Sequence, residues 1–302
     1  SVEYYYDSLS INHERKEVQG TFLSKKKVVN FGGTAGNIAY NMAQLGGKAI
    51  VAAAVGPDFK SLKYQDHLFK KNVDLRLETI QEDTTASCYI FNDPKKNQIT
   101  VFHGGALNHG GKIDLREKIS KEDNIRIAIN APNNMDAMVK FAKQLKEMDI
   151  PSIFDPGQIL NALTPEQFNS ILENSTAFIS NEHEYNAVKA RFNVDLEDLL
   201  GDLKWIIITK GVQGSLILKD GEKTTIPPSK AKVVIDPTGA GDAFRGGLLY
   251  GLTKGLDVTR AAKLGSVMGS FNVEHSGGQS YTIDINEFGT RFQETFGETP
   301  SL

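Results

Sequence analysis

Short apolar runs alternate with helical patterns along the chain from about residue 28 onward. Six runs could form buried strands, and they cover residues 49–55, 125–130, 151–155, 176–181, 205–209 and 232–236. Between them, hydrophobic residues recur at helical spacing in three stripes, namely Ala35, Ile38, Ala39, Met42 and Leu45; Met138, Phe141, Ala142 and Leu145; and Ala261, Ala262, Leu264, Gly265 and Met268. This alternation predicts an α/β fold with a doubly wound, mostly parallel sheet flanked by helices.

Two segments break this rhythm. Residues 8–30 are polar and carry no helical stripe. Residues 84–102 contain two strand-like runs, "TTASCYIF" and "QITVF", on either side of the turn "NDPKKN". This pattern is typical of an antiparallel hairpin. We expect residues of about 8–30 and 84–106 to form a small β lid on a single domain that spans residues 1–302.

Composition excludes several classes of protein. The 302 residues are 40% hydrophobic and carry a formal net charge of -3, so the chain presents no polybasic surface for nucleic acid. No apolar run approaches the roughly 20 residues that span a bilayer. The one cysteine, Cys88, excludes an internal disulfide and a cysteine metal cluster, and this usage fits a cytoplasmic protein. We therefore expect small-molecule ligands, with no nucleic-acid or membrane partner.

The stretch "VVIDPTGAGDAFRGGLLYGL", residues 233–252, contains a glycine-rich turn that leads into a helix. It fails as a dinucleotide fingerprint because the third glycine is replaced by Phe244, and because Asp242 would repel a bound pyrophosphate. Asp242 could simply cap the helix. Alternatively, the amides of Gly239, Ala240 and Gly241 hold a phosphoryl group during transfer, and Asp242 takes the proton of the attacking hydroxyl.

Two motifs carry a family resemblance. "DPTGAGDAFRGG" resembles the C-terminal signature of the ribokinase-like (PfkB) family of carbohydrate and nucleoside kinases. "NFGGTAGNIAYNMAQLGGKAIVAAAVGPD", residues 30–58, is similar to the family's N-terminal signature. The two occur in the family's order, about 200 residues apart. The resemblance implies that Asp242 is the general base, and that the sugar hydroxyls of the acceptor are bound by Gly32, Gly33 and Asn37.

Two further motifs imply a nucleotide site. Asn181-x-x-Glu184 in "SNEHEYNAV" is similar to the family motif that organises Mg²⁺ and its waters around the phosphates. From chemistry alone, a carboxylate and an amide after a strand suit Mg²⁺, but they suit a solvated helix start equally well. "TKGVQGS", residues 209–215, resembles the family's nucleotide-binding turn, with matches at Thr209, Gly211 and Gly214.

The adenosine-kinase-like branch is the most similar, and the likeness extends over nearly the whole chain. It rests on "NQITVFHGGA" (97–106), "DPGQ" (155–158) and the tail "NVEHSGGQSYT" (272–282). The resemblance implies that the tail loop, His275 to Gln279, borders the ATP adenine, that Asn272 and Gly278 serve the nucleotide, and that Asp236 and Thr238 lie at a monovalent cation (K⁺) site. Phe102 would stack on the nucleoside base or serve as a core aromatic. Arg245 would contact a phosphate or cover the helix surface with its stem.

Two departures from the branch concern the acceptor site. The branch starts with a strand that is followed by an aspartate gripping the ribose, and here "SVEYYYD" offers Asp7 without a recognisable strand before it. Gly104 stands where the branch tends to have proline, which could loosen the lid.

Together the motifs predict an ATP- and Mg²⁺-dependent kinase that phosphorylates the 5′-hydroxyl of a nucleoside, with adenosine as the expected acceptor. A sugar kinase for ribose or a fructose phosphate is the rival within the family. A nucleoside-binding protein that has lost catalysis is the rival from another class. Lid strands of this kind pair across a homodimer or stay free in a monomer, and the sequence leaves both open.

Overall fold

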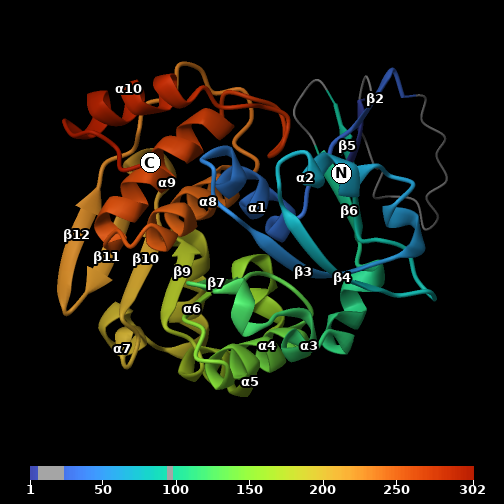
Figure 1. Cartoon of the computed structure of the whole chain (residues 1–302), viewed down its shortest axis with the longest axis horizontal. Helices are drawn as coiled ribbons and strands as arrows, with labels where there is room; N and C mark the ends of the chain where they lie inside the picture. Colours follow the sequence, from blue (N-terminus) through green and yellow to red (C-terminus); the bar gives the residue numbers. More distant parts are fainter. Residues whose placement is uncertain (6–23, 94–97) are drawn as a thin grey trace, which may run out of the picture.

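The computed structural model describes residues 1–5, 24–93 and 98–302, whose strands form three sheets (Figure 1). The strands are β1 (Val2–Tyr5), β2 (Lys26–Val29), β3 (Ile50–Val55), β4 (Asp74–Thr79), β5 (Ser87–Asn92), β6 (Gln98–His103), β7 (Ala128–Asn130), β8 (Ser152–Phe154), β9 (Ala177–Asn181), β10 (Trp205–Thr209), β11 (Ser215–Lys219) and β12 (Glu222–Ile226). The α-helices are α1 (Thr34–Gln44), α2 (Tyr64–Phe69), α3 (Leu115–Lys118), α4 (Met135–Glu147), α5 (Pro165–Glu173), α6 (Glu182–Phe192), α7 (Leu196–Leu200), α8 (Ala240–Thr253), α9 (Val258–Asn272) and α10 (Ile285–Phe296). Within the described ranges, none of these helices could cross a membrane.

The largest sheet has six strands in the order β12-β11-β10-β9-β8-β7. Strands β7 to β10 run parallel, whereas β11 pairs antiparallel with both β10 and β12. The four parallel strands coincide with four of the predicted apolar runs. Their carboxyl ends lie along one edge of the sheet, which is the usual position of ligand sites in open α/β sheets.

Helices cover both faces of this sheet (Figure 1). Along β10, Ile207 packs in one core cluster with residues of α1, α8 and α9, whereas Ile206 and Ile208 pack in a second cluster with residues of α4 to α7. All three side chains are buried, and each contributes about 1.5–3 kcal/mol to folding. The predicted α/β fold with flanking helices is therefore confirmed. The parallel pair β3–β4 forms a separate two-stranded sheet.

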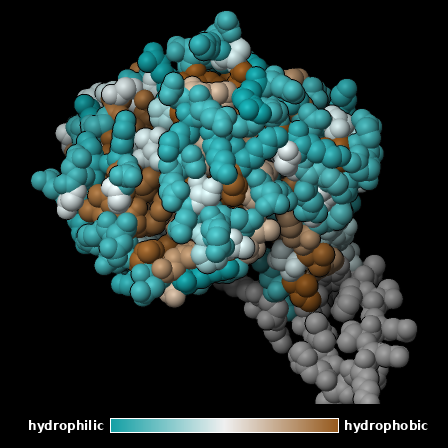
Figure 2. Space-filling model, turned by 90° about the horizontal axis from the view of Figure 1, so that it is seen from below, coloured by the Kyte–Doolittle hydropathy of each residue, from teal (hydrophilic) through white to brown (hydrophobic). Residues whose placement is uncertain are grey.

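The lid is a four-stranded sheet in the order β2-β1-β5-β6. Strands β5 and β6 form the predicted antiparallel hairpin. The first strand, which the sequence did not reveal, is present as β1, and it pairs parallel with β5 and antiparallel with β2. Figure 2 shows a patch of hydrophobic surface at the end of the coloured part of the molecule that borders the grey residues. Val29, Val101 and Phe102 are exposed hydrophobic residues of the lid strands. The part of the predicted lid in residues 8–23 lies outside the described residues.

Two features of the fold differ from the sequence-based expectation. The predicted strand at 232–236 is wrong: the amides of Ile235 and Asp236 both donate to the carbonyl of Val273, and the segment pairs with no strand among the described residues. Its apolar side chains are exposed instead of entering the sheet. In addition, β11 and β12 form an unpredicted hairpin around Asp220 and Gly221, whose φ angles are 52° and 78°. An Asp-Gly pair with two positive φ angles is favoured in tight hairpins.

Candidate active site

The glycine turn before α8 has the geometry of an anion site. Gly239 has a φ of 84°, and a Cβ atom there would lie 3.1 Å from Gly278 Cα, so only glycine fits without strain. Helix α8 begins at Ala240 without a side-chain cap. The first amides of a helix have no intrahelical acceptor, and they lie at the positive end of the helix dipole. The Ala240 amide already donates to the carbonyl of Pro237 at 3.2 Å, so of the three predicted amides those of Gly239 and Gly241 are available to a negatively charged group.

Asp242 projects from the first turn of α8. Its Oδ2 atom accepts a hydrogen bond from Asn37 Nδ2 at 2.7 Å, so its side chain is engaged with another helix rather than with the backbone of its own turn. Burial raises the pKa of Asp242 to about 6, while the Asn37 hydrogen bond and the charge of Arg245 act in the opposite direction. A carboxylate with this pKa is mostly ionised at neutral pH and can accept a proton.

Close packing of α1 against α8 brings Asn37 to Asp242. A Cβ atom on Gly246 would lie 2.7 Å from Asn41 Cβ, so this glycine allows the helices to touch. Helix α1 begins after Gly33, which has a φ of 91°. A Cβ atom on Gly32 or Gly33 would meet none of the described atoms within 4 Å, so the space beside this pair is open. The predicted acceptor residues Gly32, Gly33 and Asn37 therefore lie together, next to Asp242.

Arg245 lies beneath the turn. Its Nε and Nη2 atoms donate to Asp155 Oδ2 and Oδ1 at 2.5 and 2.8 Å, and its Nη1 atom donates to the carbonyl of Gly241 at 3.0 Å. Both side chains of the pair are buried. The alternative in which Arg245 covers the helix surface is therefore wrong. Sequence reasoning assigned no role to Asp155, although a carboxylate directly after a buried strand was the signal that could have found it.

Asn181 and Glu184 start α6 at the same edge of the sheet. They form a reciprocal capping box, in which Glu184 Oε2 accepts from the Asn181 amide and Asn181 Oδ1 accepts from the Glu184 amide, both at 2.8 Å. Burial raises the pKa of Glu184, and the negative charge of Asp155 adds to this effect. Asp155, Glu184 and Asp242 thus interact electrostatically around one cation, Arg245. Among the described residues no group of three or more His, Cys, Asp or Glu side chains is placed to hold a metal ion, so a Mg²⁺ ion here would depend largely on water and phosphate ligands.

The predicted nucleotide turn connects β10 to β11. Thr209 ends β10 and lies in register with Asn181 of β9 and Ser215 of β11. Gly211 and Gly214 have φ angles of 55° and 85°. A Cβ atom on Gly214 would lie 2.0 Å from the carbonyl oxygen of Ile226, so glycine is required there by the fold itself.

The tail after α9 lies against the glycine turn. Gly278 contacts Gly239, as described above, and Asn272 is fully buried behind Gly239. Asp236 ties the two segments together, because Oδ1 accepts from the Thr238 amide at 2.8 Å and Oδ2 from the Gly277 amide at 3.1 Å. The residues predicted for a monovalent cation therefore lie where the tail meets the turn. Sequence reasoning placed Gln279 only at the end of the loop beside the adenine and assigned no role to Tyr64. In the structure Gln279 donates to Asn37, and Tyr64 accepts from the same Gln279 nitrogen.

One predicted acceptor residue, Phe102, lies apart from this cluster, and another falls outside the described residues. Phe102 is on β6 of the lid, and 61% of its surface is exposed, so it is not a core aromatic. Asp7 lies outside the described residues.

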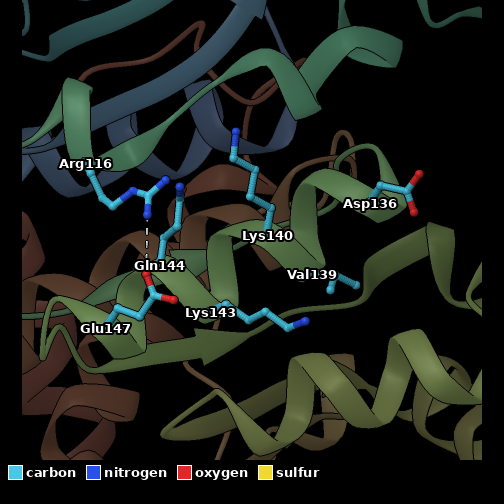
Figure 3. A pocket seen from close by; sticks show the side chains of 7 residues that line it. All are labelled: Arg116, Asp136, Val139, Lys140, Lys143, Gln144 and Glu147. Atoms are coloured by element: carbon cyan, nitrogen blue, oxygen red, sulfur yellow. Dashed lines mark ion pairs between the residues drawn. The ribbon is translucent and has the colours of Figure 1, made fainter.

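A separate groove of about 390 Å³ lies over α4 (Figure 3). Figure 3 shows Arg116 reaching from α3 toward Glu147, at an Nη1–Oε2 distance of 3.7 Å. The groove contains none of the residues predicted for catalysis or binding.

Comparison with known families decides the nature of this site. A model described as pfkB family carbohydrate kinase matches residues 4–285. The chain belongs to the pfkB family. Like other pfkB kinases, this protein is a phosphotransferase that acts on an alcohol group.

Curated relatives of this pfkB kinase include two archaeal nucleoside kinases. The protein from Methanocaldococcus jannaschii is 34% identical over 253 residues, which cover 83% of this chain and 81% of the relative. The protein from Methanothermobacter thermautotrophicus is 27% identical over 275 residues, covering 90% and 87% of the two chains.

Solved structures agree with the family and the fold. The nucleoside kinase of Burkholderia thailandensis in complex with inosine has a TM-score of 0.81 and 31% identity, and the match covers 99% of this chain and 96% of that one. The structure of the M. jannaschii nucleoside kinase, described as an archaeal member of the ribokinase family, has a TM-score of 0.88 and 28% identity, covering 97% and 94%.

Proposed function

We propose that this pfkB kinase transfers the γ-phosphoryl group of ATP to the 5′-hydroxyl of a nucleoside, with adenosine as the expected acceptor. The observation that carries the proposal is the hydrogen bond between Asn37 and Asp242. It joins a residue predicted to bind sugar hydroxyls to a carboxylate beside an anion-binding turn. The relatives named nucleoside kinases, one of them bound to inosine, support a nucleoside as the acceptor.

In the proposed mechanism, Asp242 accepts the proton of the 5′-hydroxyl. The oxygen then forms a bond to the γ-phosphorus while the bond from that phosphorus to the β,γ-bridging oxygen breaks, and ADP leaves. The amides of Gly239 and Gly241 stabilise the charge on the oxygens of the phosphoryl group during its transfer, whereas the Ala240 amide donates to the Pro237 carbonyl. Gly32, Gly33 and Asn37 hold the ribose, together with Asp7, so that the acceptor hydroxyl lies near Asp242.

The nucleotide is assigned to the carboxyl ends of β9 and β10. Thr209, Gly211 and Gly214 are proposed to contact ATP, and the tail around Gly278 to border its adenine. Glu184 and Asn181 would hold Mg²⁺ through water, in keeping with the excess negative charge there. When bound, Mg²⁺ neutralises charge on the phosphates. Arg245 holds the turn from below through Gly241, and Asn272 supports Gly239 from behind. Asp236 and Thr238 are the proposed K⁺ ligands.

The lid is proposed to cover the nucleoside base. Phe102 presents an exposed aromatic ring on β6, which suits stacking on a purine. A free sugar offers no base for this ring, so the lid is the feature that favours a nucleoside over the rival acceptors ribose and fructose phosphate.

A panel of acceptors with labelled ATP tests the proposal. We expect 5′-monophosphates from adenosine and other purine nucleosides, with kcat/KM at least tenfold higher than for ribose or fructose 6-phosphate. Preferred phosphorylation of a free sugar would overturn the nucleoside assignment. Binding of nucleosides with no phosphorylation of any acceptor would favour a non-catalytic binding protein instead.

A further inference from the structure

Gln279 lies at the centre of a hydrogen-bond chain that joins Asp242 to Gly32, in the turn before α1 that is predicted to bind the acceptor. Its Nε2 atom donates to Asn37 Oδ1 at 2.8 Å and to the hydroxyl of Tyr64 at 2.7 Å. Asn37 in turn donates to Asp242 at 2.7 Å, and Tyr64 donates to the carbonyl of Gly32 at 2.7 Å. The chain thus connects four segments that are far apart in the sequence.

Chemistry fixes the direction of every bond in this chain. The ionised carboxylate of Asp242 and the carbonyl of Gly32 can only accept hydrogen bonds. Asn37 must therefore turn its NH₂ group toward Asp242 and its oxygen toward Gln279. Tyr64 must donate to Gly32 and can then only accept from Gln279. Asn37 Oδ1 and the Tyr64 hydroxyl oxygen therefore both accept a hydrogen bond at the centre of the chain. The residue there must offer one nitrogen with two N–H donors, and the side-chain amide of Gln279 does so.

Packing holds Gln279 in this position. The residue is only 5% exposed. A Cβ atom on Gly36 would lie 2.0 Å from the Tyr64 hydroxyl and 3.3 Å from Gln279 Nε2, so this glycine makes room for the contact. The ring of Tyr64 stacks on Phe31 at a centroid distance of 4.8 Å. These contacts hold the Nε2 end of the Gln279 amide in place, whereas its Oε1 atom is buried without a hydrogen-bond partner among the described residues.

We propose that Gln279 is a positioning residue for the catalytic base: it orients the Asn37 amide so that its N–H group points at Asp242. The proposal rests on the function proposed above, in which Asp242 is the base. Gln279 acts on Asp242 through its hydrogen bond to Asn37. The same amide is also connected to the carbonyl of Gly32 through Tyr64. The hydrogen bonds therefore fix the position of Gly32, which is proposed to bind the acceptor, relative to Asp242.

The orientation has an electrostatic consequence. The groups that face Asp242 are Asn37 from α1, Arg245 from α8, Asp155 after β8, Glu184 from α6 and Tyr64 from α2. Asn37 and Arg245 favour the ionised base, whereas the two carboxylates oppose it. Without Gln279, the Asn37 amide is free to rotate away, and the ionised form of Asp242 loses a hydrogen bond.

The pH dependence of kcat/KM tests this role in Gln279→Met, which keeps the length of the side chain but has no donor. We expect its acidic limb to move to higher pH by roughly 0.5–1 unit, so that activity at pH 6 falls about two- to fivefold more than at pH 8. Gln279→Glu should move the limb in the same direction, because it removes the donors and adds negative charge. Thr282→Val, a change at an exposed residue of the same tail, should leave the limb in place.

A uniform loss of kcat/KM in both Gln279 variants, with the acidic limb unmoved, would overturn the proposal and leave Gln279 a purely structural residue. Thermal melts of each variant verify that folded protein is compared, and either variant suffices if the other does not fold. Asp242→Asn in the same series separates the two hypotheses. Unaltered turnover in that variant contradicts the proposed base, whereas strong dependence on Asp242 with an unmoved limb in the Gln279 variants contradicts only the positioning role.

Discussion

Arg245 and Asp155, 90 residues apart in the sequence, form a buried bidentate ion pair beneath the glycine turn of the active site. The third nitrogen of the guanidinium holds the carbonyl of Gly241. The pair thereby connects the end of β8 to the start of α8. A bidentate geometry of this kind is specific to arginine, because lysine cannot present a planar fork of donors.

Removing Arg245 should destabilise the protein strongly. Arg245→Met leaves Asp155 buried without its partner, and we expect the free energy of unfolding to fall by about 3–5 kcal/mol. Arg116→Met is a matched control, because Arg116 pairs with Asp114 at the surface and should contribute less than about 1 kcal/mol. Urea unfolding measures both variants. Similar losses in the two would contradict the structural importance of the buried pair.

The sequence predicted the parallel strands and the positions of the main helices well, because each has a simple periodicity. It also predicted that Gly32, Gly33, Asn37 and Asp242 act together, through two motifs. The run at 232–236 has the same apolar character as β10, yet it is not a strand. Apolar composition alone does not show whether a neighbouring strand is available. Here the carbonyl of Val273 accepts the hydrogen bonds of the Ile235 and Asp236 amides instead.

Long-range polar contacts were beyond the reach of the sequence. Asn37 and Gln279 are 242 residues apart, and no periodicity indicates that their side chains meet. Asp155 stood in a phrase that resembles the family, but its pairing with Arg245 depends on how β8 and α8 pack. By contrast, the turn of the β11–β12 hairpin is signalled in the sequence by Asp220-Gly221, a pair typical of tight hairpins.

Replacing the base should stabilise the fold in alkaline conditions. The pKa of Asp242 rises from an ordinary value near 3.8 to about 6 on folding, so the folded state binds more protons than the unfolded state between these values. The free energy of unfolding therefore falls as pH rises through this window. Asp242→Asn removes the cost of burying the ionised carboxylate, and we expect the free energy of unfolding to rise by about 1–3 kcal/mol at pH 8.

Chemical denaturation at pH 4 and pH 8 measures the effect of Asp242→Asn on stability. The difference between variant and wild type should be near zero at pH 4 and largest at pH 8. A difference that is the same at both pH values would show that burial does not disfavour the charged form of Asp242.

Replacing Glu184 should alter the dependence of activity on Mg²⁺ more than it alters the binding of the nucleoside. With Glu184→Gln, we expect the Mg²⁺ concentration for half-maximal activity to rise roughly 10- to 100-fold, because a carboxylate that orders the bound water is lost. Glu182→Gln is the control, since Glu182 is exposed and pairs with Lys210 at 3.5 Å. Titration of Mg²⁺ at saturating ATP measures both. An equal response of the two variants would remove Glu184 from the metal site.

Phe102 should matter for nucleosides and not for free sugars. Phe102→Ala removes the ring that we assign to the base, and we expect the KM for adenosine to rise roughly 5- to 20-fold, since stacking on a base contributes about 1–3 kcal/mol. Val101→Ala changes the neighbouring residue, which points to the opposite face of β6, and should have little effect. An unchanged KM for adenosine would show that the base lies elsewhere.

The most direct test of the account compares turnover with binding in Asp242→Asn. We predict that kcat for the preferred acceptor falls by about 10²–10⁴-fold, because a general base is lost, while the Kd of the nucleoside measured by calorimetry changes less than about threefold. Arg245, Asn37 and the glycine turn remain in place in this variant. A kcat close to that of the wild type would contradict the central claim and leave Asp242 a buried carboxylate at the start of α8.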